Sequence, residues 1–398
     1  MADRPKILFL VTEDWYFRSH RLPIARAARD AGAEVAVATR VRDHGAAITQ
    51  EGFRLLPLRL RRGGRNPLAE LPALAEILRL YRRERPDLVH HVAMKPVLYG
   101  ALAAALTGVP VVVNALTGLG ALFIGGSATA RLLGPVVRAA LRPLLDRADS
   151  HLILQNDDDR ALLERHGLIR HERVHLIRGS GVDVGRFRPA PEPGGPPVAA
   201  LVARMLWDKG VGEFVAAARL LKRRGVPVRL VLVGPTDPEN PAAIPEAVLR
   251  AWQEEGAVEW RGAVADIAGL WREVHIAVLP SYREGLPKAL LEAAACGRPL
   301  VAADVPGCRE IVRPGATGVL VPPRDAGALA DAIERLAGDT ALRAHLGRQA
   351  RALAEAEFAE EIVVRRTLDL YRALLPGRLE ADAPSIPLPS LLRGAGEG

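Results

Sequence analysis

Two acidic residues, Glu284 and Glu292, flank a segment whose composition suits an anionic ligand. The loop Ser281–Leu286 follows an apolar run and precedes a helical pattern that begins at Pro287. The first N–H groups of a helix have no partner within it, so Gly285 and its neighbours are expected to bind an anion such as a diphosphate. The two carboxylates would repel phosphate and are expected to accept hydrogen bonds from sugar hydroxyls. On position alone, helix-dipole compensation by Glu284 and an exposed Glu292 account for the pair more simply.

Two cations follow the apolar run VAALVA. Arg204 comes directly after this run, and Lys209 lies just before the next helical pattern. At the carboxyl end of a strand they are placed to clamp a departing diphosphate without a metal. An ordinary basic loop is the alternative, and the pair of cations beside Gly210 favours the functional interpretation.

The strands and helices that position these residues are predicted by short apolar runs that alternate with longer amphipathic ones. This alternation predicts an α/β fold with parallel sheets covered on both faces. The Pro/Gly-rich segment Arg188–Pro197 divides the pattern into two doubly wound domains, whose ligand crevices are expected beyond the strands' carboxyl ends and facing one another. The predicted strands are residues 6–12, 34–39, 54–58, 87–92, 110–115, 150–155, 173–177, 198–204, 228–234, 258–262, 276–280, 299–304 and 318–321.

Composition restricts the class of protein. The chain has 398 residues, 49% hydrophobic and 25% charged, which predicts globular domains. Two cysteines make a disulfide framework unexpected and suit a reducing cytoplasm, and the early acids of MADRPKILFLVTEDW argue against a signal peptide. Residues 96–130 carry no charge, but their prolines and glycines favour a buried helix, a strand and a loop over a membrane span.

Charge is distributed unevenly along the chain. Residues 1–189 have a net charge of +10 and the remainder −2. Arginines gather at residues 59–65 and 79–85, which indicates either a solvated surface or a face attracted to anionic lipid or diphosphate. Aromatic residues make up only 4% of the chain and Tyr81 is the one aromatic residue within these clusters, so nucleic acid is not an expected partner.

The acidic pair separated by seven residues, in EGLPKALLEAAACGRPLVAADVPGCREIV, resembles the signature of family 4 retaining glycosyltransferases. Three further segments resemble parts of that family, namely VARMLWDKGV, GVLVPPRD and GSGVDVGRF. The resemblance extends to about Leu375. It implies the GT-B fold, two Rossmann-like domains facing across a cleft. The implied boundaries are 1–188 for the acceptor domain, 189–197 for a linker, 198–358 for the donor domain, 359–376 for a helix returning to the first domain, and 377–398 for a loose tail.

The resemblance also implies roles for single residues. Glu292 would bind the ribose of a nucleotide, and Glu284 would hold hydroxyls of the donor sugar. The backbone of Gly285 and Leu286 would contact the donor phosphate.

Further roles concern the leaving group and the base. Arg204 and Lys209 would neutralise the departing diphosphate, and the backbone near Gly262 and Ala263 would cradle the base. Transfer in this family retains anomeric configuration by front-face attack and uses no protein nucleophile, divalent metal or cofactor, the nucleoside diphosphate sugar being a co-substrate.

The first half departs from the family pattern. EDWYFRSHRLP stands where many members have a glycine-rich turn, and NALTGLG stands where many have a histidine. Asn114 or Thr117 is therefore expected to line the site. His20 is expected to open a helix, either facing the interdomain cleft or acting as a cap. Lys95 is expected to bind an acceptor phosphate or to be a solvated lysine.

Three segments of the first half resemble a branch of the family that acts on lipid-linked acceptors. They are SHRLP, HHVAMKPVLYG and NALTGLG. We therefore expect a cytoplasmic enzyme, peripheral at the inner face of the cell membrane, that moves a hexose or N-acetylhexosamine from a UDP-sugar to a polyprenyl-diphosphate-linked saccharide. Three alternatives are a transferase acting on a soluble natural product, a nucleotide-sugar 2-epimerase of the same fold, and a non-catalytic sensor. Oligomeric state is left open.

Several remaining motifs favour structural roles. Asp157–Asp159 begins a helix, so capping is favoured over metal binding. His90 and His91 are neighbours on a strand and must point to opposite faces, which argues against a shared metal site. Cys296 is expected to be a buried helix-end residue. Residues 130–147 form an amphipathic pattern after the apolar loop GLGALFIGG and indicate either a core helix or a membrane contact.

Overall fold

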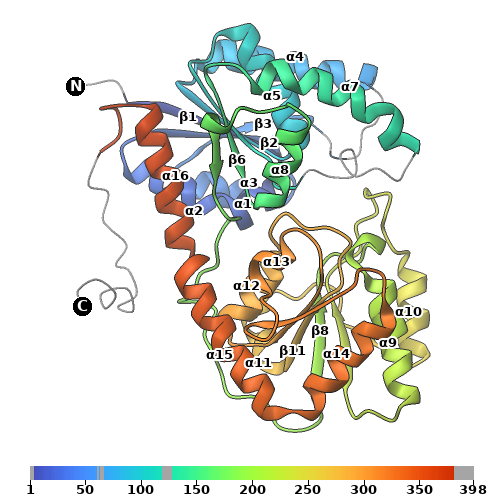
Figure 1. Ribbon diagram of the computed structural model, residues 1–398. Coiled ribbons are helices and arrows are strands. Elements are labelled where there is room, and N and C mark those ends of the chain that lie inside the picture. The colour runs from blue at the N-terminus through green and yellow to red at the C-terminus, as the bar shows by residue number, and fades with distance from the viewer. Residues whose placement is uncertain (1–3, 61, 63–66, 119–127, 381–398) are drawn as a thin grey trace. The chain divides into compact units, whose positions relative to one another are not determined.

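The computed structural model describes residues 4–60, 62, 67–118 and 128–380 (Figure 1). The chain divides into two compact units, residues 1–180 with 361–398 and residues 181–360. They are called the first and second unit below, and each is described by itself.

The first unit is built on a parallel sheet of seven strands in the order β3-β2-β1-β4-β5-β6-β7. Its strands are β1 (Lys6–Glu13), β2 (Glu34–Arg40), β3 (Arg54–Pro57), β4 (Leu88–Val92), β5 (Val111–Ala115), β6 (Ser150–Leu154) and β7 (Val174–Leu176). Its helices are α1 (Asp14–His20), α2 (Leu22–Asp30), α3 (Gly45–Gln50), α4 (Pro67–Glu84), α5 (Met94–Thr107), α7 (Ala128–Leu145), α8 (Asp157–Arg165), the 3-10 turn η1 (His171–Arg173) and α16 (Glu360–Leu374).

Side chains of β1 alternate between two cores, as the two-residue period of a strand requires. Phe9 belongs to the core beneath α1, α2 and α16, whereas Leu8 and Leu10 belong to the core beneath α4 and α5. Because both faces are covered, the strands at the centre of the sheet are mainly apolar.

Helix α16 belongs to the first unit although it follows the whole second unit in sequence (Figure 1). Val363, Leu368 and Tyr371 are buried in the same core as β1 and α2. The hydroxyl of Tyr371 is hydrogen-bonded to Nδ1 of buried His90 on β4. The first sheet therefore depends on the C-terminal segment for part of its core.

The second unit has a parallel sheet of six strands in the order β10-β9-β8-β11-β12-β13. Its strands are β8 (Val198–Val202), β9 (Arg229–Val233), β10 (Glu259–Trp260), β11 (Ile276–Leu279), β12 (Leu300–Ala303) and β13 (Gly318–Val321). Its helices are η2 (Trp207–Lys209, 3-10), α9 (Val211–Arg223), α10 (Glu246–Glu254), α11 (Ile267–Glu273), α12 (Lys288–Ala295), α13 (Cys308–Ile311), α14 (Ala326–Gly338) and α15 (Thr340–Glu357).

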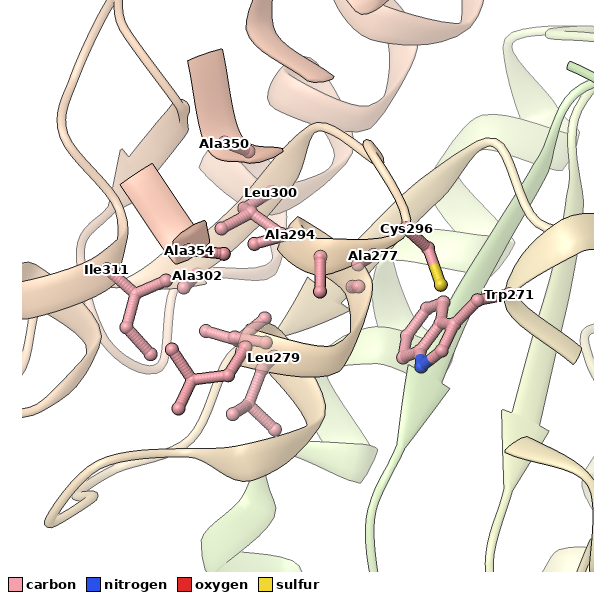
Figure 2. Close-up of a cluster of buried hydrophobic side chains, with 14 of the residues drawn as sticks. Trp271, Ala277, Leu279, Ala294, Cys296, Leu300, Ala302, Ile311, Ala350 and Ala354 are labelled. Atoms are coloured by element: carbon pink, nitrogen blue, oxygen red, sulfur yellow. The ribbon is translucent and has the colours of Figure 1, made fainter. Parts of the chain in front are cut away.

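Close packing of small residues joins α12 and α15 to this sheet (Figure 2). Ala294 of α12 and Ala350 and Ala354 of α15 lie beside Leu300 of β12, and all four are buried. An added Cβ at Gly347 would come within 2.1 Å of the carbonyl oxygen of Gly297, so α15 meets the turn after α12 with backbone in contact.

The predicted fold class is confirmed: both units are doubly wound α/β structures with parallel sheets. Strand order reverses between β1 and β4 in the first unit and between β8 and β11 in the second. Ligands of such sheets bind beyond the carboxyl ends of the strands at these switch points. The functional residues of each unit are therefore expected at this edge of its sheet.

Candidate active site

The loops that follow β8 and β11 are joined to each other at the switch point of the second sheet. The backbone N–H of Tyr282 donates to the carbonyl of Asp208 at 2.9 Å, and the Ser281 hydroxyl donates to the same carbonyl at 3.1 Å. Gly210 has a positive φ of 72°, and a Cβ there would lie 2.0 Å from the carbonyl oxygen of Pro280. Only glycine permits this approach, which fixes η2 against the loop 281–286.

This joining brings Lys209 and Glu284 together, 75 positions apart in sequence. The Lys209 Nζ lies 2.5 Å from Glu284 Oε1, with 22% of the lysine side chain and 11% of the glutamate side chain exposed. Both side chains are accessible at one edge and form a partly desolvated ion pair. Such a pair can exchange its internal contact for contacts to a bound anion and a bound hydroxyl.

Arg204 follows β8 and forms an ion pair with Asp237, with its side chain 32% exposed. Asp237 was not predicted from the sequence. It comes shortly after Gly234, which follows β9, the neighbour of β8, and a Cβ at Gly234 would lie 1.8 Å from the carbonyl oxygen of Ala203. The signal that could have identified it is an acid at the carboxyl end of the adjacent strand. Asp237 balances the charge of Arg204, so this cation is not a spare charge in the structure.

Helix α12 begins beside the Lys209–Glu284 pair. Pro287 is its N-cap residue, and no side chain of a described residue caps its first N–H groups. Gly285 is buried and Leu286 half-buried, and a Cβ at Gly307 would lie 2.4 Å from the carbonyl oxygen of Gly285. The turn after β12 therefore supports the loop, and anion binding at the α12 N-terminus stays a prediction.

Glu292 lies on α12 and is half-buried, not exposed as its position alone suggested. Burial raises the pKa of its carboxyl to about 7, although Lys288 and Arg186 act in the opposite direction. No described residue donates a hydrogen bond to this carboxyl group. An acceptor with free lone pairs on this helix fits a hydroxyl-bearing ligand.

Gly262 and Ala263 follow β10 at the same sheet edge. Gly262 has a positive φ of 62°, and its carbonyl accepts a 2.7 Å hydrogen bond from the N–H of Gly234. Ala263 is exposed. The structure thus links this segment to the end of β9, near Asp237.

A tyrosine that sequence reasoning missed supports the same loop. The Tyr282 hydroxyl donates to Glu213 Oε1 of α9 at 2.7 Å, and the Arg324 guanidinium lies 4.5 Å from its ring centroid. Burial, together with the hydrogen bond to Glu213, raises the pKa of Tyr282 to about 12. Tyr282 therefore remains a neutral donor that ties the loop 281–286 to α9.

The first unit places His20 differently from the prediction. His20 ends α1 rather than opening a helix, because α1 begins at Asp14 directly after β1. Its ring stacks on Tyr16 with centroids 4.1 Å apart, and its Nδ1 lies 2.7 Å from Ser19 Oγ.

Asn114 does not line an open site, which corrects the prediction. It is 0% exposed, and it pairs in register with His91 across β4 and β5. His91 Nδ1 lies 2.8 Å from its Oδ1, and its amide donates to Ser150 Oγ at 3.0 Å. With both ends of its amide engaged inside the sheet, Asn114 joins three strands and cannot reach a ligand. Thr117, just beyond β5, is half-buried.

Lys95 is in the first turn of α5 but is not a spare cation. Its Nζ lies 2.9 Å from Glu70 Oε1, and 20% of its side chain is exposed. The residue before the helix, Ala93, has a φ of 76° and a ψ of 166°. This conformation is strained for alanine and lies at the switch point between β1 and β4.

The histidine and aspartate motifs have the structural roles expected. His90 contacts Tyr371 and His91 contacts Tyr81, on opposite faces of the sheet. The run Asp157–Asp159 lies in the first turn of α8, where the Asn156 side chain caps the N–H of Asp159. Among the described residues, no three His, Cys, Asp or Glu side chains are placed to share a metal ion.

Two segments were expected to contact a membrane, the apolar loop GLGALFIGG and the helix that follows it, and the structure describes only part of them. The apolar loop GLGALFIGG lies outside the described residues from residue 119 onward, whereas α7 is a helix from Ala128 to Leu145. Leu141 and Leu145 of α7 are buried in a core with α8. Within residues 4–60, 67–118 and 128–380, no helix combines the length and apolar character that a membrane crossing requires.

Both units are doubly wound, and the second carries a Lys–Glu pair near the start of α12 at its switch point. Two such units define the GT-B class of fold. Comparison with known proteins identifies the family. Residues 6–153 match the family described as glycosyl transferase 4-like, and residues 196–339 match glycosyl transferases group 1.

Curated relatives match along most of the chain. The N,N'-diacetylbacillosaminyl-diphospho-undecaprenol alpha-1,3-N-acetylgalactosaminyltransferase of Campylobacter jejuni is 29% identical over 364 residues, covering 88% of this chain and 94% of the relative. The D-inositol 3-phosphate glycosyltransferase of Nocardia farcinica is 30% identical over 329 residues, covering 78% and 72%. The chain belongs to this family and is a glycosyltransferase.

Solved structures agree on the fold. Sucrose-phosphate synthase from Thermosynechococcus elongatus superimposes with a TM-score of 0.77 at 23% identity, covering 94% of this chain and 99% of that one. Anabaena HepE in complex with UDP and glucose gives 0.74 at 20% identity, covering 93% and 100%.

Proposed function

We propose that this glycosyltransferase moves a hexose or N-acetylhexosamine from a UDP-sugar to a polyprenyl-diphosphate-linked saccharide, with retention of anomeric configuration. The observation that carries the acceptor class is the similarity, over 94% of its length, to the Campylobacter enzyme named for an undecaprenol-diphosphate acceptor. The HepE structure with UDP and glucose supports UDP as the donor nucleotide.

In this proposal the second unit binds the donor. The diphosphate lies against the α12 N-terminus at Gly285 and Leu286, and Lys209 leaves Glu284 to contact its oxygens. Glu284 then accepts hydrogen bonds from the sugar, Glu292 binds the ribose, and the backbone at Gly262 and Ala263 cradles the base. Two charges of opposite sign 2.5 Å apart support this division of roles, because each stabilises the other until substrate replaces the contact.

Neutralisation of the leaving diphosphate is assigned to Lys209 and Arg204, so we propose that no divalent metal or other cofactor is needed. Arg204 reaches the diphosphate only by sharing or releasing Asp237. The acceptor hydroxyl attacks the face from which the diphosphate departs, and the leaving phosphate takes its proton.

The first unit binds the acceptor in this proposal. His20 and Thr117 are the residues assigned to contact it, Lys95 does so only if Glu70 releases it, and buried Asn114 has no part. We further propose a peripheral position on the anionic inner face of the cell membrane. The net charge of +10 on residues 1–189 supports this location, as do exposed Leu71 of α4 and exposed Leu106 of α5, two helices in contact.

The test is a transfer assay with purified enzyme, several UDP-, GDP- and dTDP-sugars, and a polyprenyl-diphosphate saccharide in detergent. The expected result is transfer from a UDP-sugar that EDTA does not reduce, with the donor's anomeric configuration kept in the product by NMR. Activity confined to GDP- or dTDP-sugars contradicts the donor assignment, and activity abolished by EDTA contradicts the metal-independent mechanism. Flotation with vesicles containing anionic lipid, compared with neutral vesicles, tests the location.

A soluble natural-product acceptor is the second candidate. The alpha-D-kanosaminyltransferase of Streptomyces kanamyceticus is 28% identical, but over only 61% of this chain. Transfer to a soluble aglycone without detergent, and none to the lipid-linked acceptor, would select this candidate.

A further inference from the structure

A pocket of about 320 Å³ lies in the second unit at the far end of α12 from the candidate active site. The linker residues Pro189–Glu192, the turn Cys296–Arg298 and one side of α15 line it. Because α12 has eight residues, its two ends are about 12 Å apart. The pocket is therefore separate from the site at the α12 N-terminus and takes no part in the mechanism above.

Four arginines line this pocket, against a single carboxylate. Two of the four are neutralised: Arg343 forms a bidentate pair with Glu192 at 2.9 and 2.8 Å, and Arg351 lies 2.6 Å from Glu355. The other two, Arg298 and Arg348, form no ion pair among the described residues, although the charge of Glu192 also acts on Arg298. The lining residues alone carry an excess of three positive charges, and counting Glu355 outside the lining leaves an excess of two.

Arg298 is the residue that points to a ligand. It is only 2% exposed, and its Nε donates to the Trp271 carbonyl at 2.8 Å. Its Nη2 donates to the Ala190 carbonyl at 3.2 Å, while Nη1 makes no hydrogen bond within the described part of the chain. Nη1 itself is accessible rather than enclosed, so it can donate to an acceptor bound in the pocket.

The rest of the pocket wall is largely apolar and limits what the pocket can hold. Pro189, Pro191 and Ala344 provide this apolar surface. The Cys296 thiol points toward the ring of Trp271, so it packs in the core (Figure 2). The volume is at the lower end of small-ligand sites and is larger than inorganic phosphate needs. An anion with a small organic part therefore fits the wall better than a bare inorganic ion.

We propose that this pocket binds a small phosphate monoester, such as a sugar phosphate or a mononucleotide. The dianionic phosphate pairs with Arg298 and Arg348, and the organic part packs on the prolines. This inference does not depend on the proposed donor or acceptor.

Isothermal titration of the full chain with glucose 6-phosphate and with AMP tests the proposal, with glucose, adenosine and inorganic phosphate as comparisons. Because Arg298 also holds the linker, the primary variant is Arg348→Glu, whose side chain is exposed and makes no hydrogen bond or ion pair with another described residue. The matched control is Arg223→Glu, the same charge change at an exposed residue of α9. The titrations are repeated with saturating UDP to exclude binding at the donor site.

The expected result is that at least one ester binds, that Arg348→Glu weakens it at least tenfold, and that Arg223→Glu changes it less than twofold. Thermal melting at the wild-type temperature shows that both variants are folded. Absence of ester binding at 10 mM, equal effects of the two variants, or inorganic phosphate binding as tightly as both esters each overturns the proposal.

Discussion

The carboxyl group of Glu292 couples folding to pH because burial raises its pKa to about 7. An acid whose pKa is raised by folding lowers stability once it ionises, so its penalty is small near pH 5 and complete above pH 7. We expect Glu292→Gln to raise the stability of the second unit at pH 8 by about 1–2 kcal/mol, less than the full shift implies because the group is half-buried, and by less at pH 5. Thermal melting at the two pH values measures this difference.

The same substitution is expected to weaken UDP binding by roughly tenfold to a hundredfold, since a charged acceptor for ribose is lost. Glu254→Gln, at an exposed glutamate of α10, is the control and should change neither property. UDP affinity equal to wild type in Glu292→Gln would contradict the assignment of this residue to the ribose.

Lys209 is the cation in direct contact with Glu284, and the proposal makes it act mainly after the donor is bound. Removing such a charge costs transition-state stabilisation, so Lys209→Ala is expected to lower kcat by about a hundredfold to a thousandfold. The donor KM should change by less than about fivefold. Steady-state kinetics separate the effect on kcat from the effect on KM, and Lys222→Ala, at an exposed residue of α9, is the control. A large rise in KM at unchanged kcat would instead assign Lys209 to ground-state binding.

At the scale of elements, Gly210 determines how η2 meets the loop after β11. A Cβ there would lie 2.0 Å from a backbone oxygen, and the residue also has a positive φ. Gly210→Ala is expected to cost about 3 kcal/mol and to lower the melting temperature of the second unit by about 10 °C. Gly225→Ala is a matched control, because its φ of 70° is similar but no atom lies within 4 Å of the added Cβ. It should cost only about 1 kcal/mol. Equal costs for the two variants would show that the approach of the loops is not tightly constrained.

The central strands were predictable because they are buried on both faces and are therefore nearly continuous apolar runs, whereas the edge strands β3, β7 and β10 are more exposed. Each of the thirteen predicted runs contains or overlaps an observed strand. Lys209 and Glu284 could be expected near each other because each follows a predicted strand at its carboxyl end. The structure then added that β8 and β11 are neighbours at a point where the strand order reverses.

Other features of the site depend on contacts between distant segments and were not predictable. Asp237 pairs with Arg204 only because β9 lies beside β8. Asn114 is buried because it lies in register with His91, and nothing in the local pattern of NALTGLG indicates this partner. The predicted position of His20 is wrong because α1 follows β1 without an intervening loop.

At the scale of the whole molecule, the order of elements makes the two units unequal. The second unit is continuous, from residue 181 to residue 360, and its two cores draw their buried side chains from this range. The first unit is interrupted, because Val363, Leu368 and Tyr371 of α16 complete a core begun by β1. Folding of the first unit therefore requires a segment made after the second unit is complete.

This asymmetry predicts different behaviour for the two halves of the chain. A fragment of residues 181–360 is expected to fold alone with a cooperative thermal transition, because it keeps both cores of its sheet. It should bind UDP within about tenfold of the intact enzyme, since every residue assigned to the donor lies within it. A fragment of residues 1–180 is expected to lack a cooperative transition, because the buried face that α16 covers is exposed to water. Circular dichroism melting and titration with UDP measure these properties. A folded 181–360 fragment without UDP affinity would mean that the donor site needs residues of the first unit, and a stable 1–180 fragment would mean that α16 is dispensable.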